Sequence, residues 1–225
     1  MSVAIIDYGS GNLRSAEKAV ERALRDQGVG QPVIVTSCPD EVARADRIIL
    51  PGVGAFGDCI AGLRALDGMA ECLEQAVIKQ GKPFLGICVG MQLLATIGQE
   101  HGVHKGLNWI GGKVKKIPPM GQNLKIPHMG QKLKIPHMGW NQIDIAGACQ
   151  THPIFSDMKS GDHAYFVHSY KFEADDPAHV MATADYGGAL PAIIGRDNII
   201  GTQFHPEKSQ GVGLQLMGNF LLWRP

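Results

Sequence analysis

The chain has 225 residues, 44% of them hydrophobic, with 21 basic and 21 acidic side chains. This length and composition are typical of a single globular domain and exclude a disordered polypeptide. A net charge of zero gives no general attraction to nucleic acid or to a membrane surface. No apolar run approaches the roughly 18 residues that a membrane-spanning helix needs, so neither class of partner is expected.

The cysteines and the first residues of the chain suggest a reducing compartment. The five cysteines are odd in number, widely spaced and without a C-x-x-C pair: Cys38, Cys59, Cys72, Cys88 and Cys149. This arrangement favours neither a disulfide framework nor a zinc site. The opening MSVAIIDYGSGN lacks the basic and long apolar regions of a signal peptide. We therefore expect a cytoplasmic protein.

The first half of the chain alternates short apolar runs with amphipathic stretches. The apolar runs predict buried strands at residues 3–7, 32–36, 47–50 and 83–87. The amphipathic stretches predict helices at 13–24, at 58–79 with a break at Asp67-Gly68, and from 91 to 97. This alternation is typical of an open, mostly parallel sheet with helices on both faces.

The second half of the chain is richer in strands than in helices. Strands are predicted at residues 109–117, 139–145, 164–172, 180–185, 192–195 and 199–204, followed by a helix at 212–223. With few helices between them, these strands indicate a mixed or antiparallel extension of the sheet. The expected fold is therefore one α/β domain over residues 1–225.

The stretch Gly86-Ile87-Cys88-Val89-Gly90 lies between a predicted strand and a predicted helix. Glycines on both sides of a nucleophile permit the sharp turn that pushes its side chain out of a sheet. The positive end of the following helix would favour a Cys88 thiolate, and the N–H of Val89 could stabilise an oxyanion. A buried structural cysteine is the alternative, but this context favours a nucleophile.

A base for this nucleophile is offered by the stretch Phe204-His205-Pro206-Glu207. Pro206 fixes the backbone after His205, and Glu207 could accept a hydrogen bond from the imidazole and hold its tautomer. Alone the motif is weak, because a histidine can simply be a surface residue. Together with Cys88 it suggests a Cys-His-Glu triad at the carboxyl ends of parallel strands.

The third motif is Pro51-Gly52-Val53-Gly54, which directly follows a predicted strand. Its glycines let backbone N–H groups approach a substrate closely, and the pattern of a phosphate-binding loop is absent. A second oxyanion donor and an ordinary strand-ending turn both fit. The three motifs predict a cysteine acyl-transfer enzyme that forms and hydrolyses a thioester, and they leave the acyl group open.

At these residues the sequence resembles the class I glutamine amidotransferases. Within them it is most similar to the glutaminase subunits of imidazole glycerol phosphate synthases, enzymes of histidine biosynthesis. The matching stretches are DYGSGNLRS (7–15), LPGVGAFGD (50–58), GICVGMQLL (86–94), HMGWN (137–141), YFVHSY (165–170) and GTQFHPEKSQ (201–210). They are spread over almost the whole chain.

The resemblance implies a role for each matching residue of the site. Cys88 would attack the side-chain amide of glutamine, with His205 as the base and Glu207 orienting it. Backbone N–H groups of the oxyanion hole and side chains that bind glutamine would come from six further residues: Gly52 or Val53 together with Val89, and Gln92, Ser169 and Tyr170. Without the resemblance, a polar group on a helix surface would be the better interpretation of Gln92.

The resemblance also implies a partner and excludes a cofactor. The ammonia would pass to a (β/α)8-barrel cyclase that makes imidazole glycerol phosphate and an aminoimidazole carboxamide nucleotide, and the two proteins would form a heterodimer. Asn12, Trp140, Asn141 and Lys208 lie in motifs that face this cyclase. Neither a metal nor an organic cofactor is needed. Three alternatives stay open: the glutaminase of another amidotransferase, such as that of the pyridoxal phosphate pathway, a cysteine peptidase, and a non-catalytic binding subunit.

Residues 116–142 consist of three similar nine-residue units, KIPPMGQNL, KIPHMGQKL and KIPHMGWNQ. The third unit, 134–142, carries Trp140 and Asn141 and takes the place of the family's HMGWN. A shift of nine residues would turn every side chain of a strand to the opposite face, so the units cannot replace one another in register. We expect residues 118–132 to form an enlarged loop, and a tolerated duplication without a role is the alternative.

Overall fold

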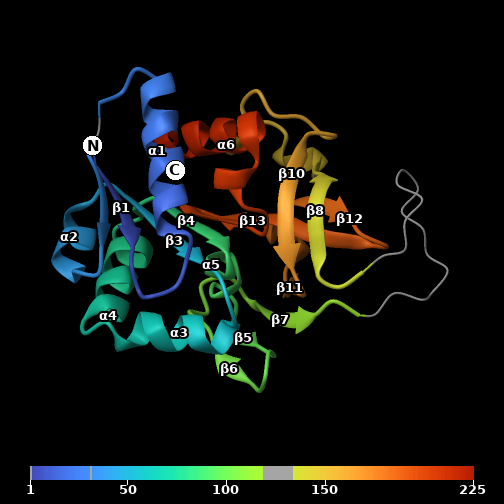
Figure 1. Ribbon diagram of the computed structural model, residues 1–225, viewed down its shortest axis with the longest axis horizontal. Helices are drawn as coiled ribbons and strands as arrows, with labels where there is room; N and C mark the ends of the chain where they lie inside the picture. Colours follow the sequence, from blue (N-terminus) through green and yellow to red (C-terminus); the bar gives the residue numbers. More distant parts are fainter. Residues whose placement is uncertain (1, 31, 119–133) are drawn as a thin grey trace.

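The computed structural model describes residues 2–30, 32–118 and 134–225 of the chain (Figure 1). The largest sheet of this described part has eight strands in the order β2-β1-β3-β4-β14-β13-β12-β9. Their bounds, in this order, are Val33–Thr36, Val3–Ile6, Arg47–Gly52, Phe84–Cys88, Ile199–Thr202, Ala189–Arg196, Val180–Asp185 and Asp144–Ile145.

The first five strands of this order pair in parallel, and the remaining strands pair antiparallel. Every residue of β1, β3, β4 and β14 is buried, because helices cover both faces of the parallel half. The predicted parallel sheet with a mixed extension is therefore confirmed.

Helices α1 (Leu13–Asp26) and α6 (Gln210–Leu222) pack against each other beside the parallel strands, and α3 (Phe56–Ala65) and α4 (Met69–Leu73) lie on the opposite side of the molecule in Figure 1. A short helix, α2 (Pro39–Arg44), contacts α4 and was not predicted. The break predicted at Asp67-Gly68 within the 58–79 helix is present, since Gly68 has a φ of +71° between α3 and α4. A π-helical segment, Glu74–Lys79, continues α4.

Two smaller sheets flank the antiparallel half. One pairs β8 (His137–Gln142) with β10 (His163–His168), and these strands lie side by side in Figure 1. The other has the order β11-β7-β5-β6, with bounds Tyr170–Ala174, Gly112–Lys116, Ile97–Gly98 and His104–Lys105. Short 3₁₀ segments at Gly147–Cys149, Pro153–Phe155, Pro177–His179 and Pro206–Lys208 complete the connections.

The helix predicted at residues 91–97 was wrong in position and length. The structure has a single turn there, α5 (Val89–Gln92). The carbonyl groups of Leu93 and Ala95 accept hydrogen bonds from the N–H groups of Leu107 and Asn108, at 2.7 and 3.0 Å. These long-range bonds take the place of helical ones, so the chain leaves the helix after one turn.

The third repeat unit supplies β8, as predicted, whereas residues 119–133 lie outside the described part of the chain. The first and third units meet in a small apolar cluster, the neck, formed by Ile117, Ile135, Tyr186 and Leu190. The Tyr186 hydroxyl donates to the carbonyl of Lys134 at 2.6 Å and accepts from its N–H at 3.3 Å. Both ends of the segment are therefore held at one place.

Within the described ranges, the structure contains no helix long and apolar enough to cross a membrane.

Candidate active site

Cys88 ends β4 with φ +54° and ψ −108°, and α5 begins at the next residue. This is an uncommon conformation for a residue with a side chain, and it is typical of a nucleophile in a strand-to-helix turn. The flanking glycines are required. A Cβ on Gly86 would lie 2.6 Å from the Gly90 carbonyl oxygen, and one on Gly90 would lie 1.9 Å from the Leu50 carbonyl oxygen.

The thiol of Cys88 opens into a cavity of about 320 Å³ at the carboxyl end of the parallel strands. The parallel register of β3 and β4 places Gly52 directly beside Cys88. Most of the residues predicted for catalysis and glutamine binding line this cavity: Val53, Cys88, Val89, Gln92, Ser169, Tyr170 and His205. Pro136, from the third repeat unit, lines it as well.

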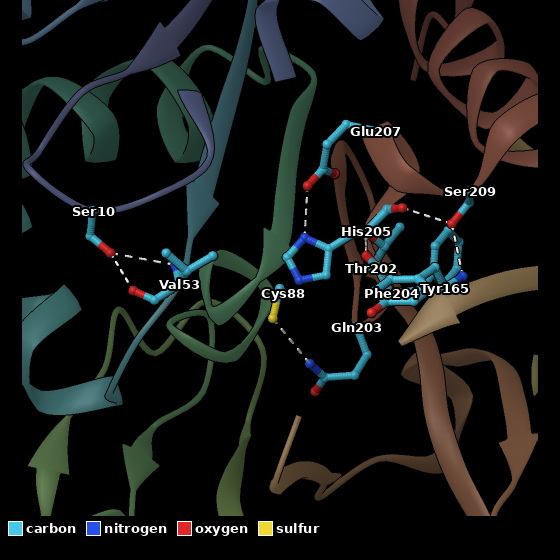
Figure 2. Close-up of polar contacts among 10 residues, drawn as sticks. All are labelled: Ser10, Val53, Cys88, Tyr165, Thr202, Gln203, Phe204, His205, Glu207 and Ser209. Carbon is cyan, nitrogen blue, oxygen red and sulfur yellow. Dashed lines mark hydrogen bonds and ion pairs between the residues drawn. The ribbon is translucent and has the colours of Figure 1, made fainter. Parts of the chain in front are cut away.

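His205 and Glu207 form a buried pair beside Cys88. The Nδ1 of His205 lies 2.7 Å from the Oε1 of Glu207, and Figure 2 shows the imidazole between this carboxylate and the Cys88 sulfur. The Nε2 of His205 is buried and has no hydrogen-bond partner among the described residues, so it is available to the thiol. Burial lowers the pKa of His205, but Cys88 and Glu207 outweigh burial and raise it to about 9.

The backbone of His205 is tied to β10. Its N–H donates to the carbonyl of Tyr165 at 3.0 Å, and its carbonyl accepts from the hydroxyl of Ser209 at 2.7 Å. The same hydroxyl accepts from the N–H of Tyr165 at 2.9 Å (Figure 2). Ser209 was not singled out from the sequence, because its two partners are known only from the folded chain.

A row of amides leads from Tyr170 to the nucleophile. The Nε2 of Gln92 donates to the Tyr170 carbonyl at 3.3 Å and to the Oε1 of Gln203 at 3.0 Å. The Nε2 of Gln203 in turn lies 3.8 Å from the Cys88 sulfur, as Figure 2 shows. Gln92 is thus buried at the cavity wall, not on an exposed helix face. Gln203 was not singled out from the sequence.

The backbone of Val53 is held by Ser10 (Figure 2). The Ser10 hydroxyl donates to the Val53 carbonyl at 2.5 Å and accepts from the Val53 N–H at 3.4 Å. The Val53 N–H, one of the predicted oxyanion donors, is therefore engaged away from the cavity in this structure. Val89, the other predicted donor, directly follows Cys88 and lines the cavity.

The residues predicted to face a partner lie at different places. Lys208 is exposed and lines the cavity next to the triad. Trp140 is 38% exposed on β8 and lines a separate hollow with Ser209. Asn141 donates to the carbonyl of Asp185 at 2.9 Å, and Asn12 precedes α1. The structure brings only Lys208 of this group to the cavity wall among the residues it describes.

Residues 4–222 match the family model for glutamine amidotransferase class-I. The chain belongs to the class-I glutamine amidotransferase family. The relatives of this amidotransferase include two named "Imidazole glycerol phosphate synthase subunit HisH". One, from Rhodospirillum rubrum, is 54% identical over 225 residues, and the other, from Mesorhizobium japonicum, is 54% identical over 228 residues; each match covers 100% of both chains.

Solved structures support the fold of this amidotransferase. A glutamine amidotransferase from Thermotoga maritima matches with a TM-score of 0.60 and 16% identity, covering 92% of this chain and 76% of that one. A CTPS glutaminase domain from Trypanosoma brucei with bound acivicin matches with a TM-score of 0.60 and 15% identity, covering 100% and 95%. At these identities the likeness concerns the fold alone.

Proposed function

We propose that this amidotransferase is the glutaminase subunit of an imidazole glycerol phosphate synthase and hydrolyses glutamine to glutamate and ammonia. The full-length relatives that carry this subunit name support the assignment. The observation that carries the chemistry is Cys88 in a strained turn, beside a buried His205–Glu207 pair at 2.7 Å.

Catalysis begins when His205 takes the proton of the Cys88 thiol and the sulfur attacks the amide carbon of glutamine. A C–S bond forms, the C–N bond breaks, and the proton on His205 leaves with the departing ammonia. Water, activated by His205, then cleaves the glutamyl thioester to glutamate and restores the thiol. Glu207 holds the Nδ1–H tautomer, which leaves Nε2 for these transfers.

Glutamine would bind in the cavity against Gln92, Ser169 and Tyr170, with the N–H of Val89 and that of Gly52 or Val53 as oxyanion donors. In the present conformation Ser10 holds the Val53 N–H. Glycines flank Val53 on both sides, so this peptide can rotate at low cost. We therefore expect an incomplete oxyanion hole and weak glutaminase activity until a partner binds.

The partner would be a (β/α)8-barrel cyclase that receives the ammonia and forms a heterodimer with this chain. It would make imidazole glycerol phosphate and an aminoimidazole carboxamide nucleotide, as part of histidine biosynthesis. Exposed Lys208 at the cavity supports docking over this end of the sheet, and exposed Trp140 on β8 offers a second contact outside the cavity. Asn12 and Asn141 complete the proposed interface.

The test is glutamine turnover with and without the cyclase from the same organism, in the parent, in Cys88→Ser and in Cys38→Ser. Cys38 is exposed and lies outside the cavity, so its variant is the matched control. We expect strong stimulation by the cyclase in the parent and the control, and no activity in Cys88→Ser. Activity in Cys88→Ser would refute the catalytic assignment, and equal parent turnover with and without the cyclase would refute partner activation.

A further inference from the structure

Gln203 is fully buried, and its side-chain amide joins the nucleophile to the wall of the cavity. It directly follows β14, in a bend at residues 203 and 204, and lies two residues before His205. Figure 2 shows the side chains of Gln203 and His205 both beside the Cys88 sulfur. Phe204, between them, points into the apolar core.

The orientation of the Gln203 amide is fixed from its far end. The Tyr170 carbonyl can only accept, and it takes hydrogen bonds from His168 at 2.7 Å and from the Nε2 of Gln92 at 3.3 Å. Gln92 therefore presents its NH₂ group to the interior. The Oε1 of Gln203 therefore accepts the hydrogen bond from Gln92 at 3.0 Å. This leaves the Nε2 of Gln203 facing the Cys88 sulfur at 3.8 Å.

The sulfur needs such a donor. The sequence predicts a helix after Cys88 whose positive end would favour a thiolate, but the structure has only the one turn of α5 there. When the thiol proton moves to His205, the imidazolium faces the sulfur from one side. The Gln203 N–H reaches the sulfur at a second position, at 3.8 Å, and its hydrogen bond gains strength as the acceptor becomes charged.

We infer that Gln203 is a positioning residue for the glutaminase reaction, which holds the Cys88 sulfur with its N–H and fixes the orientation of Gln92 with its oxygen. The inference rests on the proposed function. Gln203 donates hydrogen bonds but transfers no proton, so the proton balance between Cys88 and His205 is unchanged. Because the NH₂ of Gln92 is used internally, the Oε1 of Gln92 is the group left for a donor on the substrate.

This arrangement predicts two separable effects of removing the amide. Gln203→Met fills a similar space but has no donor, and its thioether sulfur is only a weak acceptor. Without the N–H, the thiolate loses a hydrogen bond, and we expect kcat in the presence of the cyclase to fall about tenfold, the size typical of one bond to a charged group. Without the oxygen, Gln92 is less well oriented, and we expect KM for glutamine to rise.

The decisive measurement needs neither glutamine nor partner. The rate at which iodoacetamide alkylates Cys88 is measured from about pH 5 to about pH 10, the range in which protein thiols titrate. The same measurement on Cys88→Ser gives the alkylation of the other cysteines, which is subtracted. We expect Gln203→Met to move the midpoint of this curve to higher pH, because the thiolate has lost a donor. Gln203→Asn, whose shorter side chain withdraws the amide from the sulfur, should move it in the same direction.

The matched control is Thr202→Val. Thr202 is buried at the end of β14, next to Gln203, and donates to the Phe204 carbonyl at 3.1 Å, so loss of its hydroxyl removes one buried hydrogen bond that does not involve the sulfur. We expect reduced thermal stability and an unchanged alkylation curve for this control. If Gln203→Met fails to fold, Gln203→Asn takes its place, and its thermal stability and its alkylation curve are compared with those of the parent.

An alkylation curve equal to that of the parent in the folded Gln203 variant would overturn the inference, and so would an equal shift in Thr202→Val. A protein that alkylates as expected but never hydrolyses glutamine, even with the cyclase, would refute the proposed function instead. In that case the alkylation curves still decide whether Gln203 holds the sulfur.

Discussion

Ser10 acts on Val53 through a single hydroxyl that both donates and accepts. Its hydrogen points to the Val53 carbonyl, and its oxygen accepts from the Val53 N–H. Cys59 lies within 3.3 Å of the same hydroxyl and completes its surroundings. The backbone of Val53, which lies near Cys88 in the folded chain, is thus held by a side chain from the loop after β1, 43 residues earlier in the sequence.

We predict that Ser10→Ala raises glutaminase activity in the absence of the cyclase. The variant releases the N–H of Val53, and each hydrogen bond lost is worth about 1 kcal/mol, so a several-fold increase is expected. The measurement is the basal rate of glutamate formation. Ser160→Ala removes a hydroxyl that binds the N–H of Ile145, far from the cavity, and should leave the basal rate unchanged. A basal rate for Ser10→Ala equal to that of the parent would show that Ser10 does not restrain Val53.

Two buried histidines join β8 to β10. His168 donates from Nδ1 to the Tyr170 carbonyl, so its neutral Nε2 accepts from the Nδ1 of His137 at 3.0 Å. The Nε2 of His137 then accepts from Asn141 at 3.2 Å, and its ring stacks on Tyr186 with the ring centroids 4.0 Å apart. Both imidazoles must be neutral for this row of hydrogen bonds to form.

These histidines should make the protein sensitive to acid. Burial lowers the pKa of His137 to about 3 and that of His168 to about 4, whereas the unfolded chain binds protons on histidine below about pH 6.5. Between these limits the unfolded state binds more protons than the folded state. The stability from neutral histidine is therefore complete above pH 6.5 and is lost as the pH falls toward 4. His205, with its raised pKa, is protonated in both states in this window.

We predict that His137→Gln flattens this pH dependence. Glutamine can replace the hydrogen bonds in part but cannot ionise, so the variant should be less stable than the parent at pH 8 and should lose less stability between pH 7 and pH 5 (the window around the ordinary histidine pKa of about 6.5). Urea unfolding at each pH measures the effect. His163→Gln, at an exposed position on β10, is the control and should follow the parent. A parent-like slope in His137→Gln would exclude this pair as the source of the acid sensitivity.

The elements that could be predicted from the sequence are those whose own residues determine the structure. Buried parallel strands such as β3 and β4 are continuous apolar runs, and the break at Gly68 and the elbow around Cys88 are marked by glycine. The length of α5 could not be predicted, because it is ended by hydrogen bonds from residues 107 to 110. Gln203 could not be predicted as a site residue for a related reason: its contact with Cys88, 115 residues away in sequence, forms only in the folded chain.

The repeat is attached to the rest of the fold through its first and third units. β7 ends at Lys116 and β8 begins at His137, and the neck of Ile117, Ile135, Tyr186 and Leu190 closes the segment between them. Everything that the fold uses from the repeat among the described residues therefore lies in the first residues of the first unit and in the third unit.

We predict that deleting residues 122–130, which removes one nine-residue unit, leaves the fold intact. The deletion keeps Ile117, Ile135 and all of β8, and halving or doubling a closed loop changes its entropy cost by only about 0.6 kcal/mol. Thermal unfolding should change little, whereas the affinity for the cyclase decides whether the extra unit contributes to docking. Loss of folding would refute the expected loop, and unchanged affinity and stimulated activity would show that the repeat is neutral.

The neck has a consequence for how this gene can vary. Each unit begins with Lys-Ile-Pro, so an isoleucine recurs at positions 117, 126 and 135. Gain or loss of a whole unit between the first and third units leaves an isoleucine at both sides of the neck. Copy number can therefore change in steps of one unit without altering the residues that Tyr186 and Leu190 contact.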